Sequence, residues 1–274
     1  MKKISVIMMS LALLMGCKKA EKPDGEVNTS ADFTLAGSEF VKISESVLRS
    51  YLVTPFVLRN GTVTCDSLTQ ISGDTLPTSA RTYTRLAAGS SCGIKAIATR
   101  SGTLKIMQWG RVNAPDNKMT IKLKDYNKAL GAKAYTFSCD SLVLNNIRQV
   151  NGKWVYQLNV LNGKMQDGAA IITLALTATV TVMDREVSLL LAGNGASRDG
   201  KKFNFSQDTD PVFKASDCEH FTVGSVGIAP EGASTRFIDY GAGGCDFEAD
   251  VYFLDLHSAK EQIQEANRMR IELK

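Results

Sequence analysis

The sequence predicts an all-β protein, mainly an antiparallel sandwich or open barrel, with an amphipathic helix near the N-terminus and a short helix near the C-terminus. Two observations predict this class. Short runs rich in β-branched and aromatic residues alternate apolar with polar side chains, which is typical of strands with one wet face. Asn-Gly and Asp-Gly dipeptides separate these runs, and such residues tolerate the positive φ angles of tight hairpin turns.

The first seventeen residues predict an export signal. Lys2 and Lys3 precede an apolar run over residues 4–15, which is followed by Gly16 and Cys17. A basic start, a short apolar stretch and a small residue before a cysteine are typical of a lipoprotein signal peptide, and the stretch is too short to span a bilayer. We therefore expect a signal peptide over 1–16, acylation of Cys17 and an outer-membrane location, with the surface or periplasmic orientation left open.

Residues 17–35 are expected to form the lipidated cysteine and a flexible tether, because this stretch begins with polar and charged residues that have little to bury. A helix is predicted over 38–52, where Phe40, Ile43 and Val47 recur at helical spacing, and Pro55 ends it. We expect its apolar face to cover the main sheet rather than to bind a partner.

A β-rich domain is predicted over 36–190 and a C-terminal β subdomain over 191–274, with continuity between the two left open. The expected strands lie at 103–109, 118–123, 153–161, 171–182 and 186–191. The expected turns lie at 60–61, 151–152, 162–163, 167–168 and 199–200. Near the end, Ser258 and Glu261 have the spacing of a capping box, which predicts a short helix to about Arg270 and then a closing strand over 271–273.

Net charge bears on the class of partner. The full chain carries +4, and loss of residues 1–16 removes two lysines, which leaves +2. This near-neutral balance, without a basic stripe interleaved with aromatics, argues against a nucleic-acid partner and does not suggest polybasic membrane docking. We expect the membrane as a partner through the lipid on Cys17, a glycan or an envelope protein as a further partner, and no cofactor.

Five cysteines follow Cys17. Export places them in an oxidising compartment and none falls in a C-x-x-C motif, so disulfides are favoured over zinc ligation. Equal separations of 27 residues favour two pairs, and spacing alone leaves the connectivity open. The favoured pairs are Cys65 with Cys92 and Cys218 with Cys245, which leaves Cys139 free.

The C-terminal region also carries a family resemblance. Residues 197–203, 210–213 and 238–246, together with Cys218, resemble the C-terminal half of an uncharacterised Bacteroidota-type β-rich lipoprotein family with a DYGxGxCD motif. Residues 92–111 are similar to the earlier half, so the resemblance covers most of the mature chain. Ala242 and Phe247 depart from the family pattern, which weakens a ligand role for that loop. The resemblance implies an exported, lipid-anchored β-rich protein and no biochemical activity.

Two groups of residues are candidates for ligand binding. Carboxylates near glycines could hold a hard cation such as calcium, although the regular EF-hand spacing is missing. A disulfide-pinned turn, with aspartates bonding local amides, explains the same residues and is preferred. Three aromatics could form a sugar-stacking platform if exposed on one face, and core packing is the preferred alternative. The candidates are Asp239, Asp246, Glu248 and Asp250 for metal, and Trp109, Trp154 and Tyr156 for stacking.

A nucleophile-elbow pattern, G-x-S-x-G, occurs at residues 89–93 with Ser91 at its centre. It lacks the helical crossovers of an α/β sheet, and a base would have to be His220 or His257, so we assign no catalytic residue. The leading hypothesis is a lipid-anchored envelope protein with a non-enzymatic binding, structural or interaction role and an unknown ligand. One alternative is a carbohydrate-binding lipoprotein of a glycan-uptake system, and a second is an envelope hydrolase.

Overall fold

The computed structural model describes residues 27–53, 67–72, 81–87, 98–207, 210–253 and 268–273. Within these ranges it contains one helix, α1, and a 15-stranded sheet whose neighbouring strands pair antiparallel. The predicted all-β class is therefore confirmed. All five strands expected from the sequence are present, and most are longer than predicted because alternation continues through polar residues.

Helix α1 spans Asn28–Val53, so it begins ten residues before the predicted start. The prediction of a tether to residue 35 is wrong at this point. Phe33 and Ala36 extend the apolar spacing toward the N-terminus, and both are fully buried. The polar residues that made this stretch resemble a tether, such as Asp32 and Thr34, are buried as well and have partners on the sheet. No residue from Val27 to Arg49 is exposed.

The described strands form one continuous sheet. Its main path runs β1-β2-β3-β4-β5-β7-β8-β9-β10-β12-β13-β14-β15, while β6 pairs with β4 and β7, and β11 pairs with β9 and β12. In chain order the strands are β1 Ser67–Ser72, β2 Arg81–Ala87, β3 Ala98–Trp109, β4 Lys118–Leu130, β5 Lys133–Ser138, β6 Ser141–Val150, β7 Lys153–Asp167, β8 Ala170–Val182, β9 Glu186–Ala196, β10 Lys202–Gln207, β11 Val212–Ala215, β12 Val223–Pro230, β13 Arg236–Ala242, β14 Glu248–Phe253 and β15 Arg268–Glu272. A domain boundary at 190/191 would cut β9, so the continuous arrangement is the one observed.

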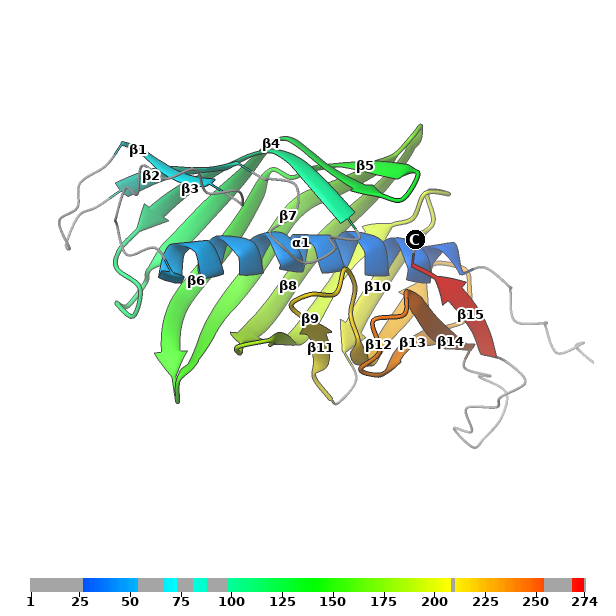
Figure 1. Cartoon of the computed structure of the whole chain (residues 1–274). Coiled ribbons are helices and arrows are strands. Elements are labelled where there is room, and N and C mark those ends of the chain that lie inside the picture. The colour runs from blue at the N-terminus through cyan, green and yellow to red at the C-terminus, as the bar shows by residue number, and fades with distance from the viewer. Residues whose placement is uncertain are drawn as a thin grey trace, which may run out of the picture.

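The sheet curls around α1 (Figure 1), with β1–β5 above the helix in this view, β7–β10 behind it and β11–β15 below. Alternation along the strands sorts side chains onto an inner face toward α1 and an outer face toward solvent. In β8, for example, Leu174, Leu176 and Val180 are buried, while Thr177 is exposed. The core is therefore a layer of apolar side chains between α1 and the inner face, and the arrangement is an open wrapped sheet rather than two stacked sheets.

Turn chemistry explains most of the hairpins. The turns at 151–152, 167–168 and 199–200 connect β6 to β7, β7 to β8 and β9 to β10, which confirms those predictions. The predicted turn at 162–163 is wrong, because Asn162 and Gly163 lie inside β7 at a register shift. A Cβ atom on Gly163 would come within 2.8 Å of the Phe40 ring. The missing side chain at this position therefore leaves room for Phe40 of α1, and the glycine does not form a turn. Residues 60–61 lie outside the described residues.

The C-terminal end differs from the prediction. Arg268–Glu272 forms β15, which pairs antiparallel with β14. A helix reaching Arg270 is therefore wrong for residues 268–270, and the closing strand begins three residues earlier than expected. Cross-strand ion pairs of Arg268 and Arg270 with Asp250 favour the extended conformation. The predicted helix start at Ser258 lies outside the described residues.

Candidate binding site

The inner face holds α1 through a buried ion-pair cluster. Glu39 is fully buried, and its Oε1 lies 2.8 Å from Arg100 Nε on β3 while its Oε2 lies 3.0 Å from Lys128 Nζ on β4. Tyr126 donates a hydrogen bond to Glu39 at 2.7 Å. Burial would raise the pKa of Glu39, but Arg100 and Lys128 outweigh it and hold that pKa well below its ordinary value. Glu219, which pairs with both cations, makes the cluster neutral.

The other buried acids of α1 also face cations. Asp32 accepts hydrogen bonds from the backbone and the guanidinium of Arg198, although burial still raises its pKa. Glu45 pairs with Arg49 at 2.8 Å and lies 3.8 Å from Lys214 Nζ. Burial, with the neighbouring charge of Lys42, lowers the pKa of Lys214 to about 7. These groups are buried between helix and sheet and bind each other, so their role is to seat α1.

The predicted aromatic platform is not formed. Tyr156 is 1% exposed and its hydroxyl lies 2.8 Å from Ser44 Oγ on α1. Trp154, two residues earlier on the same strand, shares that inner face and packs against the core. Trp109 follows buried Gln108 on β3 and so lies on the outer face, where Lys118 Nζ sits 4.6 Å from its ring centroid. The stacking prediction is therefore wrong, because the aromatics lie on opposite faces of the sheet.

The predicted metal ligands do not form a common site among the described residues. Asp239 lies opposite Asp250 on neighbouring strands, and its carboxylate accepts a hydrogen bond from the amide of Gly241 at 2.8 Å. Asp246 accepts one from the amide of Glu248 at 3.3 Å. Among the described residues, no three potential metal ligands come together. Bonding to local amides, which is the preferred interpretation of these residues, accounts for Asp239 and Asp246.

Arginines of β15 occupy the remaining predicted ligands. Glu248 lies 3.0 Å from Arg270, which also pairs with Asp250 at 3.3 Å, and Asp250 forms an additional ion pair with Arg268. These contacts lower the pKa of Asp250, although its partial burial acts in the opposite direction. Both carboxylates therefore serve strand pairing.

The cysteines agree with the prediction where they are described. Cys218 and Cys245 form a disulfide with their Cα atoms 5.7 Å apart, which confirms that pair. Cys139 is free, and burial raises its pKa to about 11, so it is a poor nucleophile. Cys17, Cys65 and Cys92 lie outside the described residues, and the predictions for them remain predictions.

The hydrolase alternative needed an accessible base. His220 is 2% exposed, its ring centroid lies 5.0 Å from that of Phe247, and neither ring nitrogen has a hydrogen-bond partner among the described residues. Burial lowers its pKa to about 4. An imidazole in this position does not reach a substrate in solvent. Ser91 and His257 lie outside the described residues.

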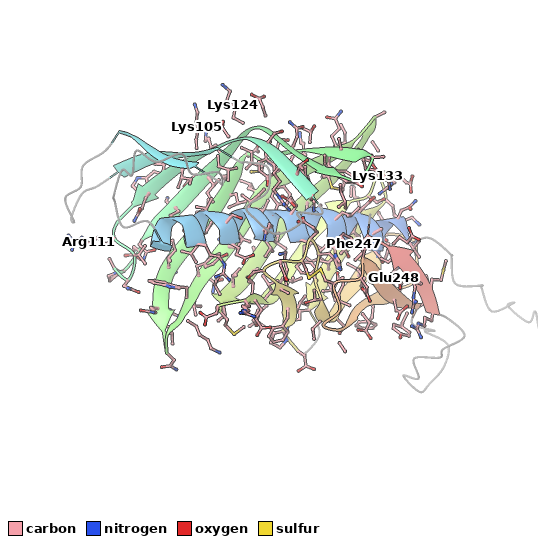
Figure 2. The ribbon with its side chains drawn as sticks, viewed as in Figure 1. Lys105, Arg111, Lys124, Lys133, Phe247 and Glu248 are labelled. Atoms are coloured by element: carbon pink, nitrogen blue, oxygen red, sulfur yellow. A yellow bond between two sulfur atoms is a disulfide. The ribbon has the colours of Figure 1, made fainter. Side chains whose placement is uncertain are left out.

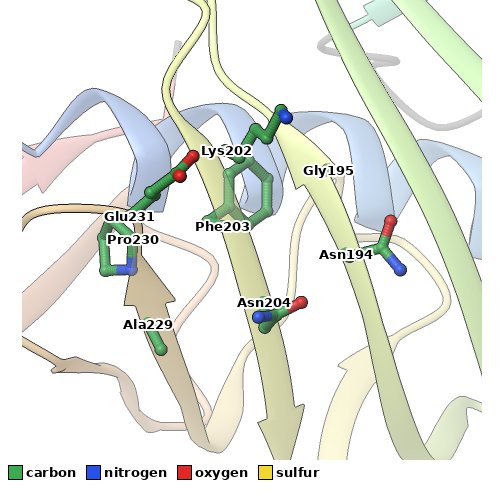
Figure 3. A pocket seen from close by; sticks show the side chains of 8 residues that line it. All are labelled: Asn194, Gly195, Lys202, Phe203, Asn204, Ala229, Pro230 and Glu231. Atoms are coloured by element: carbon green, nitrogen blue, oxygen red, sulfur yellow. The ribbon is translucent and has the colours of Figure 1, made fainter.

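The outer face offers a different site. A hollow of about 550 Å³ opens across β9, β10 and β12 (Figure 3). A hollow of about 300 Å³ shares lining residues with it and also with a third hollow of about 440 Å³. Ser206 and Gln207 line both smaller hollows, and Asn204 lines the largest and the smallest. We refer to the three together as the outer groove. It runs across the strands from β7 to β13.

Most of the hydrogen-bonding side chains that line the outer groove are uncharged, and apolar residues such as Leu190 and Ala192 lie between them. Asn194 and Asn204 lie opposite each other on β9 and β10, both exposed, and neither amide makes a side-chain hydrogen bond in the part of the chain that is described. Gln207 uses its Oε1 to accept from the Leu191 amide, which leaves its NH₂ group available. Of the described residues that line the groove, only Lys202 and Glu231 are charged, and both lie at one end. Such a surface matches a polar, uncharged ligand.

An aromatic ring borders this groove. Phe237 lies opposite Gly227 on the neighbouring strand, and a Cβ atom on that glycine would approach the ring to 3.3 Å. The ring therefore lies close over the glycine on the outer face, beside the amide of Asn204. Sequence reasoning missed this site because its residues meet only through strand register. The signal was present as polar residues at every second position of β10.

Comparisons with family models, with curated proteins and with solved structures find no match for this chain. Within the described residues, no helix is long and apolar enough to cross a membrane.

Proposed function

We propose that this chain is a lipid-anchored protein of the outer membrane with a non-enzymatic binding role, and a member of the Bacteroidota-type lipoprotein family that it resembles. Three features support the anchor and the family. The signal pattern ends at Cys17, α1 begins at Asn28 and leaves only a short connection to the lipid, and the Cys218–Cys245 disulfide suits an oxidising compartment.

The observation that carries the binding role is the outer groove. The inner face has no room for a ligand because α1 fills it and pairs with its charges. The groove presents exposed amides at Asn194 and Asn204 that bind no other described side chain. Uncharged groups of this kind bind and orient a ligand but do not supply a nucleophile or a proton donor near neutral pH, which favours binding over catalysis.

The anchor is tested by mass spectrometry of the N-terminal peptide from the native host membrane. We expect a peptide that starts at Cys17 and carries diacylglycerol and a further acyl chain. A Cys17→Ser variant serves as the control. It should keep its signal peptide and be absent from the detergent-soluble lipoprotein fraction. An unprocessed N-terminus at Met1 in the wild-type chain would contradict the proposal.

A second candidate function, recognition of a neutral glycan, is favoured by the Phe237 ring beside the amides of the groove. Apolar faces of sugars stack on aromatic rings, while their hydroxyls suit paired amides. We expect neutral oligosaccharides on an array to retain the mature chain, and Asn204→Ala or Phe237→Ala to weaken binding roughly ten-fold or more. Thr120→Ala, on the outer face of β4 and outside the groove, should bind as wild type. Equal binding by all variants would contradict this function.

A further inference from the structure

The outer face of β3 and β4 carries a cluster of exposed lysines: Lys105, Lys122 and Lys124. Each sits outward because its neighbours on the strand, such as Ile106 and Ile121, are buried against α1. Lys105 and Lys124 project from the same side of the sheet, away from the helix (Figure 2). We call these three residues the lysine face.

Strand register concentrates these charges. Lys105 lies directly opposite Lys122, Thr103 lies opposite Lys124, and the backbone of Arg85 on β2 lies opposite Lys105. Like charges at directly opposite positions destabilise a sheet. Among the described residues, none of the three lysines makes an ion pair, whereas Lys128, only a few residues along β4, pairs with Glu39 and Glu219. These exposed charges are hydrated and have no carboxylate partner among the described residues, so they are available to an anion from outside the chain.

The residues around the lysine face indicate which kind of anion it would bind. Trp109 lies on this face under Lys118, and Met107 lies on it between Trp109 and Lys105. Lysine beside tryptophan and an aliphatic side chain is typical of surfaces at the headgroup level of a bilayer, where lysine reaches phosphate and the apolar groups meet the acyl boundary. The composition fits an extended lipid surface better than a single soluble anion.

Chain length supplies a second argument. Only residues 18–27 separate Cys17 from α1, and ten residues span at most about 35 Å. The 26 residues of α1 are about 39 Å long. The domain is therefore held within about its own length of the surface that receives the lipid, so headgroups stay at high local concentration around it. A basic patch on the domain would add a second contact with the membrane to the lipid anchor on Cys17.

We propose that the lysine face rests on anionic phospholipid headgroups of the membrane that holds Cys17. This inference rests on the anchor of the proposed function and adds an orientation to it. The sheet wraps around α1, so the lysine face lies on a different side of the molecule from β10–β13 (Figure 1). Docking through β3 and β4 therefore leaves the Phe237 end of the outer groove turned away from the bilayer.

The test is co-sedimentation of residues 17–274 carrying Cys17→Ser with lipid vesicles. We expect binding to phosphatidylcholine vesicles that contain about 30% phosphatidylglycerol, no binding to pure phosphatidylcholine, and loss of binding in about 0.5 M NaCl. In the triple variant Lys105→Ser/Lys122→Ser/Lys124→Ser, the affinity for these vesicles should fall by a factor of roughly ten or more. Its circular dichroism should match that of the parent, because the side chains replaced are exposed.

A matched control separates position from net charge. Lys153→Ser/Lys164→Ser/Arg185→Ser removes the same charge from exposed basic residues elsewhere, and it should bind as the parent does. Equal weakening by the two triple variants, binding to a soluble polyanion but not to vesicles, or no binding to anionic vesicles would each overturn the inference. The assay uses an unlipidated chain, so its outcome is independent of the mass of the Cys17 peptide, and the two proposals can fail separately.

Discussion

The two faces of the sheet differ in how their charged side chains are placed: those on the inner face are buried in ion pairs, and the lysines of β3 and β4 on the outer face are exposed. On the inner face, Glu39 is fully buried and lies within 3.0 Å of two cations from neighbouring strands. On the outer face, Lys105 and Lys122 lie opposite each other without a carboxylate partner in the part of the chain that is described. An unpaired buried charge costs several kcal/mol, whereas an exposed lysine remains hydrated. The inner face is therefore fixed by folding, and the outer face is available for partners.

The largest effect expected from this comparison is on the inner face. Glu39→Gln removes a buried carboxylate and leaves Arg100 and Lys128 with a single acid, so the free energy of unfolding should fall by about 3–5 kcal/mol. Urea denaturation measures it. Glu186→Gln, at an exposed position of β9, should change stability by less than ~0.5 kcal/mol. A similar small change for Glu39→Gln would mean that the cluster does not seat α1.

A buried group between β11 and β12 behaves differently from the paired charges. His220 has no hydrogen-bond partner among the described residues, and burial lowers its pKa from about 6.5 to about 4. Between these two values the unfolded chain binds a proton that the folded chain does not, so stability falls as the pH drops from 6.5 to 4, by about 3 kcal/mol in total. His220→Phe should remove this part of the slope in pH-dependent urea denaturation. Parallel slopes for the two proteins would contradict it.

A smaller effect concerns a neutral contact with α1. Tyr156→Phe removes the hydrogen bond to Ser44 and leaves that hydroxyl bonded to the Val41 carbonyl, so we expect a loss of about 1 kcal/mol. Tyr252→Phe, at a half-buried position on the outer face of β14, is the matched control and should be within ~0.5 kcal/mol of wild type. Thermal unfolding of both variants measures the difference. A larger loss of stability in Tyr252→Phe than in Tyr156→Phe would contradict this prediction.

The smallest effect is expected at the lysine face. Lys105→Ser/Lys122→Ser relieves a like-charge pair, so stability should stay unchanged or rise by up to ~0.5 kcal/mol. Lys128→Ser, on the inner face of the same strand, should instead cost about 3 kcal/mol, because Glu39 and Glu219 lose a partner. Urea denaturation in low salt compares the two. A clear loss of stability in the outer variant would show that these lysines have a partner within the fold.

The sequence predicted what depends on local pattern. Strand alternation, three of the turns and the pairing of Cys218 with Cys245 follow from residues close in the chain or from an equal spacing. Asp32 misled the prediction of the tether, because its partner Arg198 lies 166 residues away. The outer groove and the lysine face were missed for a related reason. Each combines alternate residues of neighbouring strands, such as Asn194 with Asn204, and only register brings them together.

The inner face of the sheet is internal structure, and the outer face is expected to meet partners. Covalent lysine labelling in native membranes, compared with labelling of the detergent-released protein, distinguishes the two faces. We predict that Lys105, Lys122 and Lys124 label after release and are protected in the membrane, that Lys202 labels in both, and that buried Lys128 and Lys214 label in neither. Equal labelling of the three outer lysines in both preparations, or labelling of Lys128 in the folded protein, would contradict the account.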